Sequence, residues 1–386
     1  MAAKSCIIIG SGISGPVAAI ALSRLGLQCT IYELRDSPST IGGSINLTPN
    51  ALRLLKDLDV VVPGGVIPKI QIFSYHTGSQ LGEISFWEPN GNSLRVVRSQ
   101  LHKALLKAVE KAGVSVEYGH KLVSIDDDPA QEVVAHFENG LSARGDFVLG
   151  CDGMYSTVRL NYVEAARVPI YTGAATAYTT VDATGLKAPI HFTATAVNSG
   201  RYGSLLTTYT DPERKSVFLA AVMETPEQGS KEGWRARGMD HETTNLEVKR
   251  RYQNTAFPCI PELLERVDEW TFYPVCRLEP RGKWARGRVL LLGDAAHGVC
   301  LVALDKISKA NHSRCRHKAK AQGLPLRTQY CLAVYWRCFM TSPYPPSSEH
   351  MRTRAGRGLT WRTMMQPPDG KAQRTSRGSR KSFMSG

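Results

Sequence analysis

The sequence predicts an α/β protein in which a mostly parallel sheet is interrupted by a strand-rich insert. Three observations lead to this fold class. A strand–helix–strand pattern opens the chain, buried-type strands recur at residues 146–151 and 288–292, and alternating apolar and polar segments occur within residues 168–275. Because buried strands lie on both sides of the insert, we expect the chain to leave the first domain and return to it.

The first element is a β-α-β unit. An apolar run at residues 5–9 predicts a buried strand, and a glycine-rich turn follows at residues 10–15. Apolar residues between Val17 and Leu25 recur at helical spacing, and residues 29–33 form a second short strand. A turn of this kind, opening directly into a helix, is typical of sites that hold the phosphates of a dinucleotide.

The glycines of the turn and the acid after the second strand suit such a ligand. Gly10 permits the tight turn, Gly12 lets a pyrophosphate approach the backbone, and Gly15 lets the helix pack on the strand. Glu33 stands where a carboxylate accepts hydrogen bonds from ribose hydroxyls. An acid there favours FAD or NAD over NADP. Taken alone, the glycine pattern also fits a purely structural turn.

The remaining elements follow from periodicity and turn residues. Helices are expected from Pro49 and at 99–112, a hairpin at 69–87, and strands at 114–118, 121–125, 132–137 and 146–151. In the insert we expect strands near 189–196, 203–210 and 216–223, and a helix near 243–255. The predicted domains are 1–167 with the hairpin, the insert 168–275, and a return to the first domain at 276–302.

Two further motifs each follow a buried strand. Gly150-Cys151-Asp152-Gly153-Met154-Tyr155-Ser156-Thr157-Val158-Arg159 is the first, and Gly293-Asp294-Ala295-Ala296-His297 is the second. Either one alone fits a strand followed by a polar turn. Together with the glycine turn, they favour FAD over NAD.

The three motifs, in this order, resemble the class A flavoprotein monooxygenases of the p-hydroxybenzoate hydroxylase type, in their fungal secondary-metabolism branch. The resemblance covers residues 5–298 and implies a Rossmann-like FAD-binding domain with a β-rich substrate domain inserted. It implies the following FAD contacts: Gly10, Gly12, Gly15 and Glu33 at the ADP half; Asp152, Gly153 and Arg159 in a motif serving both FAD and NAD(P)H; Asp294 at the ribityl chain; and Gly43 and Arg98 near the flavin.

The resemblance also implies an activity. NADPH or NADH reduces the FAD, O₂ adds to form a C4a-hydroperoxyflavin, and oxygen passes to an aromatic or polycyclic small molecule by hydroxylation or epoxidation. Because the cofactor supplies this chemistry, we expect neither a catalytic triad nor a metal. Arg201, in the insert, is the one candidate catalytic residue, for positioning a phenolate or the nicotinamide, and a plain loop arginine is the alternative.

Charge and cysteine content set the remaining expectations. The formal net charge of +14 comes entirely from residues 303–386, which carry 17 Lys and Arg against 3 Asp and Glu. That segment lacks apolar periodicity, so we expect a disordered tail. The nine cysteines show no paired spacing, which argues against a disulfide framework. No apolar run is long enough for a membrane span, and we expect a cytoplasmic protein that binds no nucleic acid.

The basic tail has a second explanation in the genetic code. After His297 the resembled family continues with a Gly-Gln-Gly turn and a helix bearing Glu-Asp-Ala, which this chain lacks. The codons of Val299-Cys300 admit an intron start, those of Ala310-Asn311 a branch point, and those of Ser313-Arg314 an intron end. Removing fifteen codons and two further bases, 47 bases in all, shifts the frame so that the downstream codons permit the missing turn and helix. We therefore predict a retained intron.

Three alternatives stay open. The chain is an inactive frameshifted product of a monooxygenase gene, or it is a flavin reductase of the same fold. The weakest alternative is a nucleic-acid-binding protein that acts through its basic tail. A halogenase is disfavoured because the Trp-x-Trp-x-Ile-Pro signature is absent from the sequence. Neither the substrate nor the oligomeric state follows from the sequence.

Overall fold

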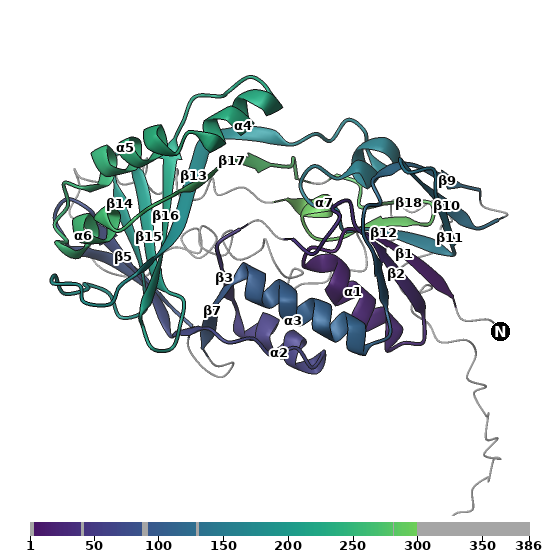
Figure 1. The fold of residues 1–386 in the computed structure, drawn as a ribbon, viewed down its shortest axis with the longest axis horizontal. Coiled ribbons are helices and arrows are strands. Elements are labelled where there is room, and N and C mark those ends of the chain that lie inside the picture. The colour runs from purple at the N-terminus through teal and green to yellow at the C-terminus, as the bar shows by residue number, and fades with distance from the viewer. Residues whose placement is uncertain (1–3, 40–41, 87–91, 129–130, 281, 299–386) are drawn as a thin grey trace, which may run out of the picture. The chain divides into compact units, whose positions relative to one another are not determined.

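A computed structural model describes residues 4–39, 42–86, 92–128, 131–280 and 282–298. The tail predicted for residues 303–386 lies outside the described residues. Within them the chain forms two large sheets, two small three-stranded sheets and the helices that pack on these (Figure 1).

The first large sheet has the strand order β18-β19-β12-β1-β2-β8. Its strands are β1 (Ser5–Ile9), β2 (Gln28–Tyr32), β8 (Ser115–Glu117), β12 (Phe147–Gly150), β18 (Ala285–Arg286) and β19 (Val289–Leu291). All neighbours run parallel except β18 and β19. Strand β12 is buried along its whole length, as expected of an inner strand covered on both faces.

Helices α1 (Ser14–Ser23) and α3 (Arg98–Lys111) pack against each other beside this sheet (Figure 1). Leu101, Leu105 and Val109 of α3 recur every four residues, so they share the buried face of that helix. The short π-helix η1 (Arg159–Val163) follows β12, and α7 (Asp294–His297) follows β19.

Two small antiparallel sheets extend this part of the molecule. One joins β9 (Leu122–Asp127), β10 (Val133–Phe137) and β11 (Ser142–Gly145), and the other joins β3 (Ser44–Leu47), β7 (Ser93–Val97) and β4 (Gly65–Ile67). Helix α2 (Pro49–Asp57) begins after Thr48, whose hydroxyl accepts a hydrogen bond from the Ala51 N–H at 3.2 Å. Strand β7 leads directly into α3 and thereby positions Arg98 at the start of that helix.

The second large sheet has the order β17-β13-β16-β15-β14-β5-β6. Its strands are β5 (Lys69–Ser74), β6 (Gln80–Ser85), β13 (Ile170–Asp182), β14 (Thr195–Gly200), β15 (Gly203–Tyr209), β16 (Ser216–Glu224) and β17 (Thr271–Arg277). All neighbours are antiparallel except β14 and β5. Alternate residues therefore point to opposite faces of a sheet that is covered on one side by helices.

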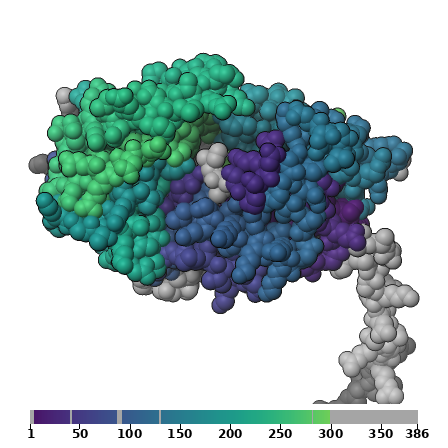
Figure 2. Space-filling model, in the orientation of Figure 1, coloured from purple at the N-terminus to yellow at the C-terminus, as the bar shows by residue number. Residues whose placement is uncertain are grey.

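Those helices are α4 (Lys231–Met239), α5 (His241–Tyr252) and α6 (Cys259–Glu265). In the space-filling view they form part of the green surface of the insert (Figure 2). The core beneath them includes Trp270, Tyr252 and Leu263, each at most 1% exposed. A second cluster, which contains Tyr178 and Phe218, gathers side chains that alternate with those of the helix-covered core along β13 and β16.

The structure agrees with the predicted α/β architecture and corrects it in detail. The hairpin predicted at residues 69–87 within the first domain instead pairs into the seven-stranded sheet through β5 and β14. The strand expected near 189–196 begins only at Thr195. Helices α4 and α6, like strand β11, were not predicted, because each is too short for its apolar periodicity to stand out from the flanking sequence.

Candidate functional site

The motifs identified in the sequence converge at one edge of the parallel sheet. Strands β2, β1, β12 and β19 are consecutive neighbours, and parallel strands end at the same edge. The glycine turn follows β1, Glu33 follows β2, Asp152 follows β12, and Asp294 follows β19. The crevice beyond the carboxyl ends of the strands is where open α/β sheets bind their ligands.

Three glycines of the first turn meet different surroundings. A Cβ on Gly10, which has φ +101°, would lie 2.7 Å from the Cys151 carbonyl oxygen. A Cβ on Gly15 would lie 2.0 Å from the carbonyl oxygen of Gly10. Packing therefore excludes any side chain at these two positions. A Cβ on Gly12 would meet no atom within 4 Å, so the room beside it is open to a ligand.

Glu33 is buried against the same turn. Its Oε2 accepts a hydrogen bond from the Ser11 N–H at 2.7 Å, and its Oε1 accepts one from the Arg35 N–H at 3.1 Å. Each carboxylate oxygen can accept a second hydrogen bond. The predicted ribose contact thus remains chemically available, while the structure gives Glu33 a further role in holding the turn.

Arg98, Asp294 and Gly42 lie together although they are far apart in the sequence. A Cβ on Gly42, which has φ +131°, would lie 2.6 Å from Cδ of Arg98, and the Arg98 N–H donates to the Gly43 carbonyl at 2.8 Å. The Arg98 guanidinium is close enough to Asp294 to lower the pKa of that carboxyl, against the larger raising effect of burial. This group marks the flavin-side end of the predicted site.

Two buried carboxyl oxygens at this edge have no protein donor among the described residues. They are Oδ1 of Asp152 and Oδ1 of Asp294. Burial raises the pKa of both carboxyls. For Asp152, the hydrogen bond from the Val158 N–H to Oδ2, 3.1 Å long, only partly opposes the effect of burial. Since an unsatisfied buried acceptor is costly, these oxygens suit the hydroxyl or amide donors of a bound ligand such as FAD.

Arg159 makes its described contacts with the backbone of the protein, and its predicted cofactor contact stays a prediction. Its side chain is fully buried, and its guanidinium donates to the backbone carbonyls of Arg167 at 2.9 Å, Ala295 at 2.8 Å and Met154 at 2.5 Å. Arg167 is also buried and donates to the carbonyl of Ala296 at 2.8 Å. The two arginines thus hold the backbone of α7, the helix that begins at Asp294.

Gly43 is packed against the insert. A Cβ there would lie 2.1 Å from Cε2 of Phe218 and 2.8 Å from Cδ2 of Tyr178. The rings of Tyr178 and Phe218 have centroids 5.8 Å apart, and that of Tyr273 lies 5.7 Å from Tyr178. Aromatic rings of the seven-stranded sheet therefore border the flavin-side group of Arg98, Asp294 and Gly42.

No contact in the described structure joins Arg201 to the residues around the glycine turn or to the flavin-side group of Arg98, Asp294 and Gly42. It lies exposed in the two-residue turn between β14 and β15, with its guanidinium carbon 5.6 Å from the centroid of the Tyr202 ring. The Tyr202 carbonyl accepts a hydrogen bond from Arg251 of α5 at 3.1 Å. The catalytic role of Arg201 stays a prediction.

Sequence reasoning missed His102 and Arg167. His102 is 4% exposed on α3, and its Nε2 lies 2.7 Å from the Ser11 carbonyl oxygen. A histidine in the register of Leu101 and Leu105 was a usable signal, because an apolar helix face rarely carries a polar ring without a partner. Arg167 gave no such signal, since it lies in an irregular segment.

A cysteine, a histidine and an asparagine in the insert have the contacts of a hydrolase triad. Nδ1 of His191 lies 3.3 Å from Sγ of Cys259, and its Nε2 lies 2.8 Å from Oδ1 of Asn198. Cys259 and Asn198 are both 0% exposed, and burial raises the pKa of the Cys259 thiol. A thiol that is neutral and beyond the reach of a substrate is not a nucleophile, so this group is a satisfied core network.

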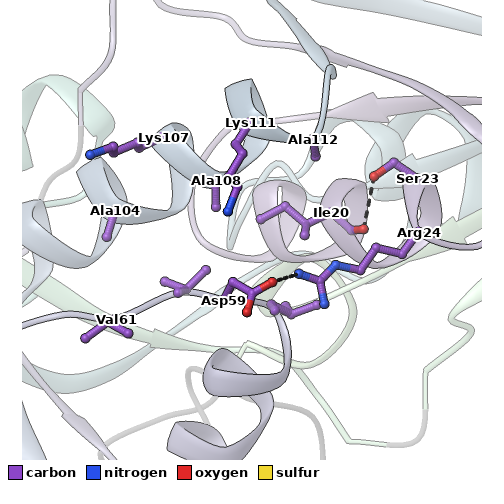
Figure 3. A pocket seen from close by; sticks show the side chains of 12 residues that line it. Ile20, Ser23, Arg24, Asp59, Val61, Ala104, Lys107, Ala108, Lys111 and Ala112 are labelled. Atoms are coloured by element: carbon purple, nitrogen blue, oxygen red, sulfur yellow. Dashed lines mark hydrogen bonds and ion pairs between the residues drawn. The ribbon is translucent and has the colours of Figure 1, made fainter.

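A cavity of about 530 Å³ lies at the opposite end of α1 from the glycine turn (Figure 3). Its lining includes Lys107 and Lys111 of α3, and Arg24, which forms an ion pair with Asp59 at 2.6 Å. No predicted site residue lines it. Within the described ranges, no cluster of three or more His, Cys, Asp or Glu is placed to hold a metal, and no helix is long and apolar enough to cross a membrane.

A parallel sheet ending in a glycine turn, a buried acid and two unsatisfied carboxyls defines an α/β dinucleotide-binding protein. Residues 3–302 match the family described as FAD binding domain, and the chain belongs to that family. Family membership confirms the predicted cofactor FAD, and together with the structural neighbours it confirms the predicted fold class.

The chain is similar over most of its length to curated proteins and solved structures. It is 25% identical to 6-hydroxynicotinate 3-monooxygenase of Bordetella bronchiseptica over 303 residues, 75% of each chain. It is 28% identical to 3-hydroxybenzoate 6-hydroxylase of Polaromonas naphthalenivorans over 324 residues, 78% of this chain and 77% of the relative. The structure of Klebsiella pneumoniae HpxO with FAD and uric acid matches with a TM-score of 0.66 at 21% identity, covering 87% of this chain and 88% of that one.

Proposed function

We propose that this protein is an FAD-dependent monooxygenase that consumes NADPH or NADH and hydroxylates or epoxidises an aromatic or polycyclic small molecule. The observation that carries the proposal is the meeting of Arg98, Asp294 and Gly42 beside a ring cluster of the insert. The family match and the named hydroxylase and monooxygenase relatives support it.

Different residues of this chain bind different parts of FAD. The turn around Gly12 and the first turn of α1 offer backbone N–H groups to the diphosphate, and Glu33 accepts from the ribose of the adenosine half. Asp294 accepts from the ribityl chain through its unsatisfied Oδ1. FAD, when bound, would take electrons from the nicotinamide and activate O₂, which is the source of the transferred oxygen atom.

The aromatic cluster of Tyr178, Phe218 and Tyr273 suits the predicted class of substrate. Flat rings bind an aromatic ring by offset or edge contacts and exclude water from its surface. A Cβ on Gly43, the neighbour of Gly42, would lie 2.8 Å from Cδ2 of Tyr178, so the cluster packs directly on the flavin-side loop. The protein's part in the reaction is thus to orient the substrate and to exclude water, without a catalytic acid of its own.

We further propose that the gene belongs to a fungal secondary-metabolism branch and that the chain retains an intron after His297. The net charge of zero over residues 1–302, against +14 beyond, supports a change of reading frame at that point. Sequencing of transcripts across the codons of His297–Cys315 tests this directly. Transcripts that never lack the 47 bases would contradict the retained intron.

A paired assay tests the activity. The 386-residue form and the form encoded after removal of the 47 bases are compared for FAD content, NADPH and NADH oxidation, oxygenated product and H₂O₂ release. We expect the spliced form to couple oxidation to product, and the 386-residue form to bind FAD weakly and release mainly H₂O₂. A colourless spliced form whose melting temperature does not respond to FAD would overturn the flavoprotein proposal. Equal, well-coupled oxygenation by the two forms would overturn the expectation that the 386-residue form is a poor monooxygenase.

A further inference from the structure

The backbone of Ser11 is held on both sides by buried side chains from other elements. Its N–H donates to Glu33, which follows β2, and its carbonyl accepts from His102 of α3, each over 2.7 Å. The exposed fractions are 2% for Ser11, 7% for Glu33 and 4% for His102. Because a carbonyl can only accept, Nε2 of His102 carries the proton in this contact.

These two contacts fix the orientation of two successive peptide planes. The N–H and C=O of a trans peptide point in opposite directions. With the Ser11 N–H directed to Glu33, the Gly10 carbonyl faces the other way, which agrees with its position 2.0 Å from where a Cβ of Gly15 would lie. With the Ser11 carbonyl directed to His102, the Gly12 N–H faces away from α3.

The Gly12 N–H is therefore held in place before any ligand arrives. No atom lies within 4 Å of a Cβ built on Gly12, so this stretch of backbone borders open space. An N–H group fixed beside the N-terminus of a helix is a donor for an anionic oxygen. A donor that is already oriented binds more tightly than one that must first be ordered, since its conformational entropy has been lost during folding.

We propose that His102 is a positioning residue for the diphosphate of FAD, acting through the peptide between Ser11 and Gly12. The inference rests on the proposed FAD-dependent function. His102 and Arg98 are one turn apart on α3, about 6 Å along the helix axis. A single helix thus sets both the phosphate-side donor and the flavin-side arginine, and a change at His102 acts only on the former.

The test compares His102→Phe, which removes the donor, with His102→Gln, whose side-chain amide keeps one. His241→Phe is the matched control, because His241 also contacts a backbone carbonyl, that of Trp270 at 3.2 Å, but lies in the insert. Dissociation constants of the 386-residue chain are measured for FAD and ADP by titration calorimetry. Adenosine, which has the ribose but no phosphate, is measured by ligand-observed NMR.

For His102→Phe we expect the dissociation constants for FAD and ADP to rise about tenfold or more, with adenosine unchanged. His102→Gln should restore binding to within about threefold of the wild type, and His241→Phe should match the wild type. Equal losses for ADP and adenosine, or FAD binding by His102→Phe within about twofold of the wild type, would overturn the positioning role. If the 386-residue wild type binds too little FAD to titrate, the same variants are compared in the spliced form. Absence of FAD binding by both wild-type forms would overturn the proposed function itself, and the inference with it.

Discussion

The two large sheets position their functional residues in different ways. In the parallel sheet, β1, β12 and β19 are neighbours, and each is followed directly by a motif that the sequence displays. In the seven-stranded sheet, β5 lies beside β14, and Gln71 accepts a hydrogen bond from the N–H of Thr193, 122 residues later in the chain. Site residues can be located from local sequence in the first sheet, whereas in the second they depend on long-range pairing.

Among substitutions on the side of the parallel sheet, we expect the largest loss of stability at Arg159. Its replacement by alanine leaves the carbonyls of Met154, Arg167 and Ala295 without their buried donor. We expect a loss of about 3–5 kcal/mol in the free energy of unfolding, measured by urea denaturation. Arg159→Lys should restore little, because an ammonium group cannot reach three carbonyls in the geometry of a guanidinium. A loss below about 1 kcal/mol would show that α7 is held by other contacts.

Gly15→Ala and Gly12→Ala separate packing from ligand binding within a single turn. Alanine at position 15 would meet the Gly10 carbonyl, so we expect the unfolding free energy to fall by about 1–3 kcal/mol. Alanine at position 12 meets no protein atom, so the stability of the chain without FAD should be unchanged while FAD affinity falls about tenfold or more. Thermal unfolding with and without FAD measures both, and a destabilised Gly12→Ala would refute the assignment of that space to a ligand.

Much of this side of the molecule was predictable. The turn glycines, Glu33, Asp152 and Asp294 could be placed because strand–turn motifs report local geometry, and parallel strands bring their ends together. The hairpin of β5 and β6 was predicted as part of the first domain, whereas it pairs into the seven-stranded sheet, because alternation reveals a strand but not its partner. The backbone contacts of Arg159 were likewise hidden, since a buried cation is identified by its acceptors and not by sequence spacing. For His102 the spacing on α3 indicated burial, but it did not reveal the acceptor.

Glu33→Arg tests the adenosine end of the site. The substitution removes an acceptor for the ribose hydroxyls and also the acceptor of the Ser11 N–H. We expect FAD binding to weaken by about 1.5–3 kcal/mol, measured by titration calorimetry. Glu33→Gln, which keeps an acceptor oxygen without the charge, should lose less. If both variants bind FAD like the wild type, Glu33 does not contact the nucleotide.

Asp294→Asn tests the flavin end through pH. Burial raises the pKa of Asp294 in the folded chain, so without FAD its contribution to stability is fully present at low pH. That contribution is lost as pH rises from about 4, the value for an unfolded aspartate, through the raised pKa. Asp294→Asn should remove the part of this fall in the free energy of unfolding that is due to Asp294. The part due to Asp152, whose pKa burial also raises, should remain. Urea denaturation of both forms between pH 4 and pH 8 measures the difference, and identical pH profiles would contradict it.

The smallest effect on stability is expected at Arg201, on the side of the seven-stranded sheet. The side chain is exposed in a turn, so Arg201→Gln should change the unfolding free energy by no more than about 0.5 kcal/mol and leave FAD affinity unchanged. If Arg201 positions substrate or nicotinamide, kcat/KM of the spliced enzyme falls while its FAD content stays constant. An unchanged kcat/KM would show that Arg201 is an ordinary turn residue that positions neither substrate nor nicotinamide.

The pairing of β5 with β14 also has a consequence for synthesis on the ribosome. The β5–β6 hairpin leaves the exit tunnel before β14 is translated. The β5 edge therefore stays unpaired while about a hundred residues are added to the chain. An unpaired strand edge is a template for pairing with another nascent chain. A gene fragment that starts after this hairpin would therefore produce a sheet with an exposed β14 edge, and a transplanted insert would need the hairpin to be carried with it.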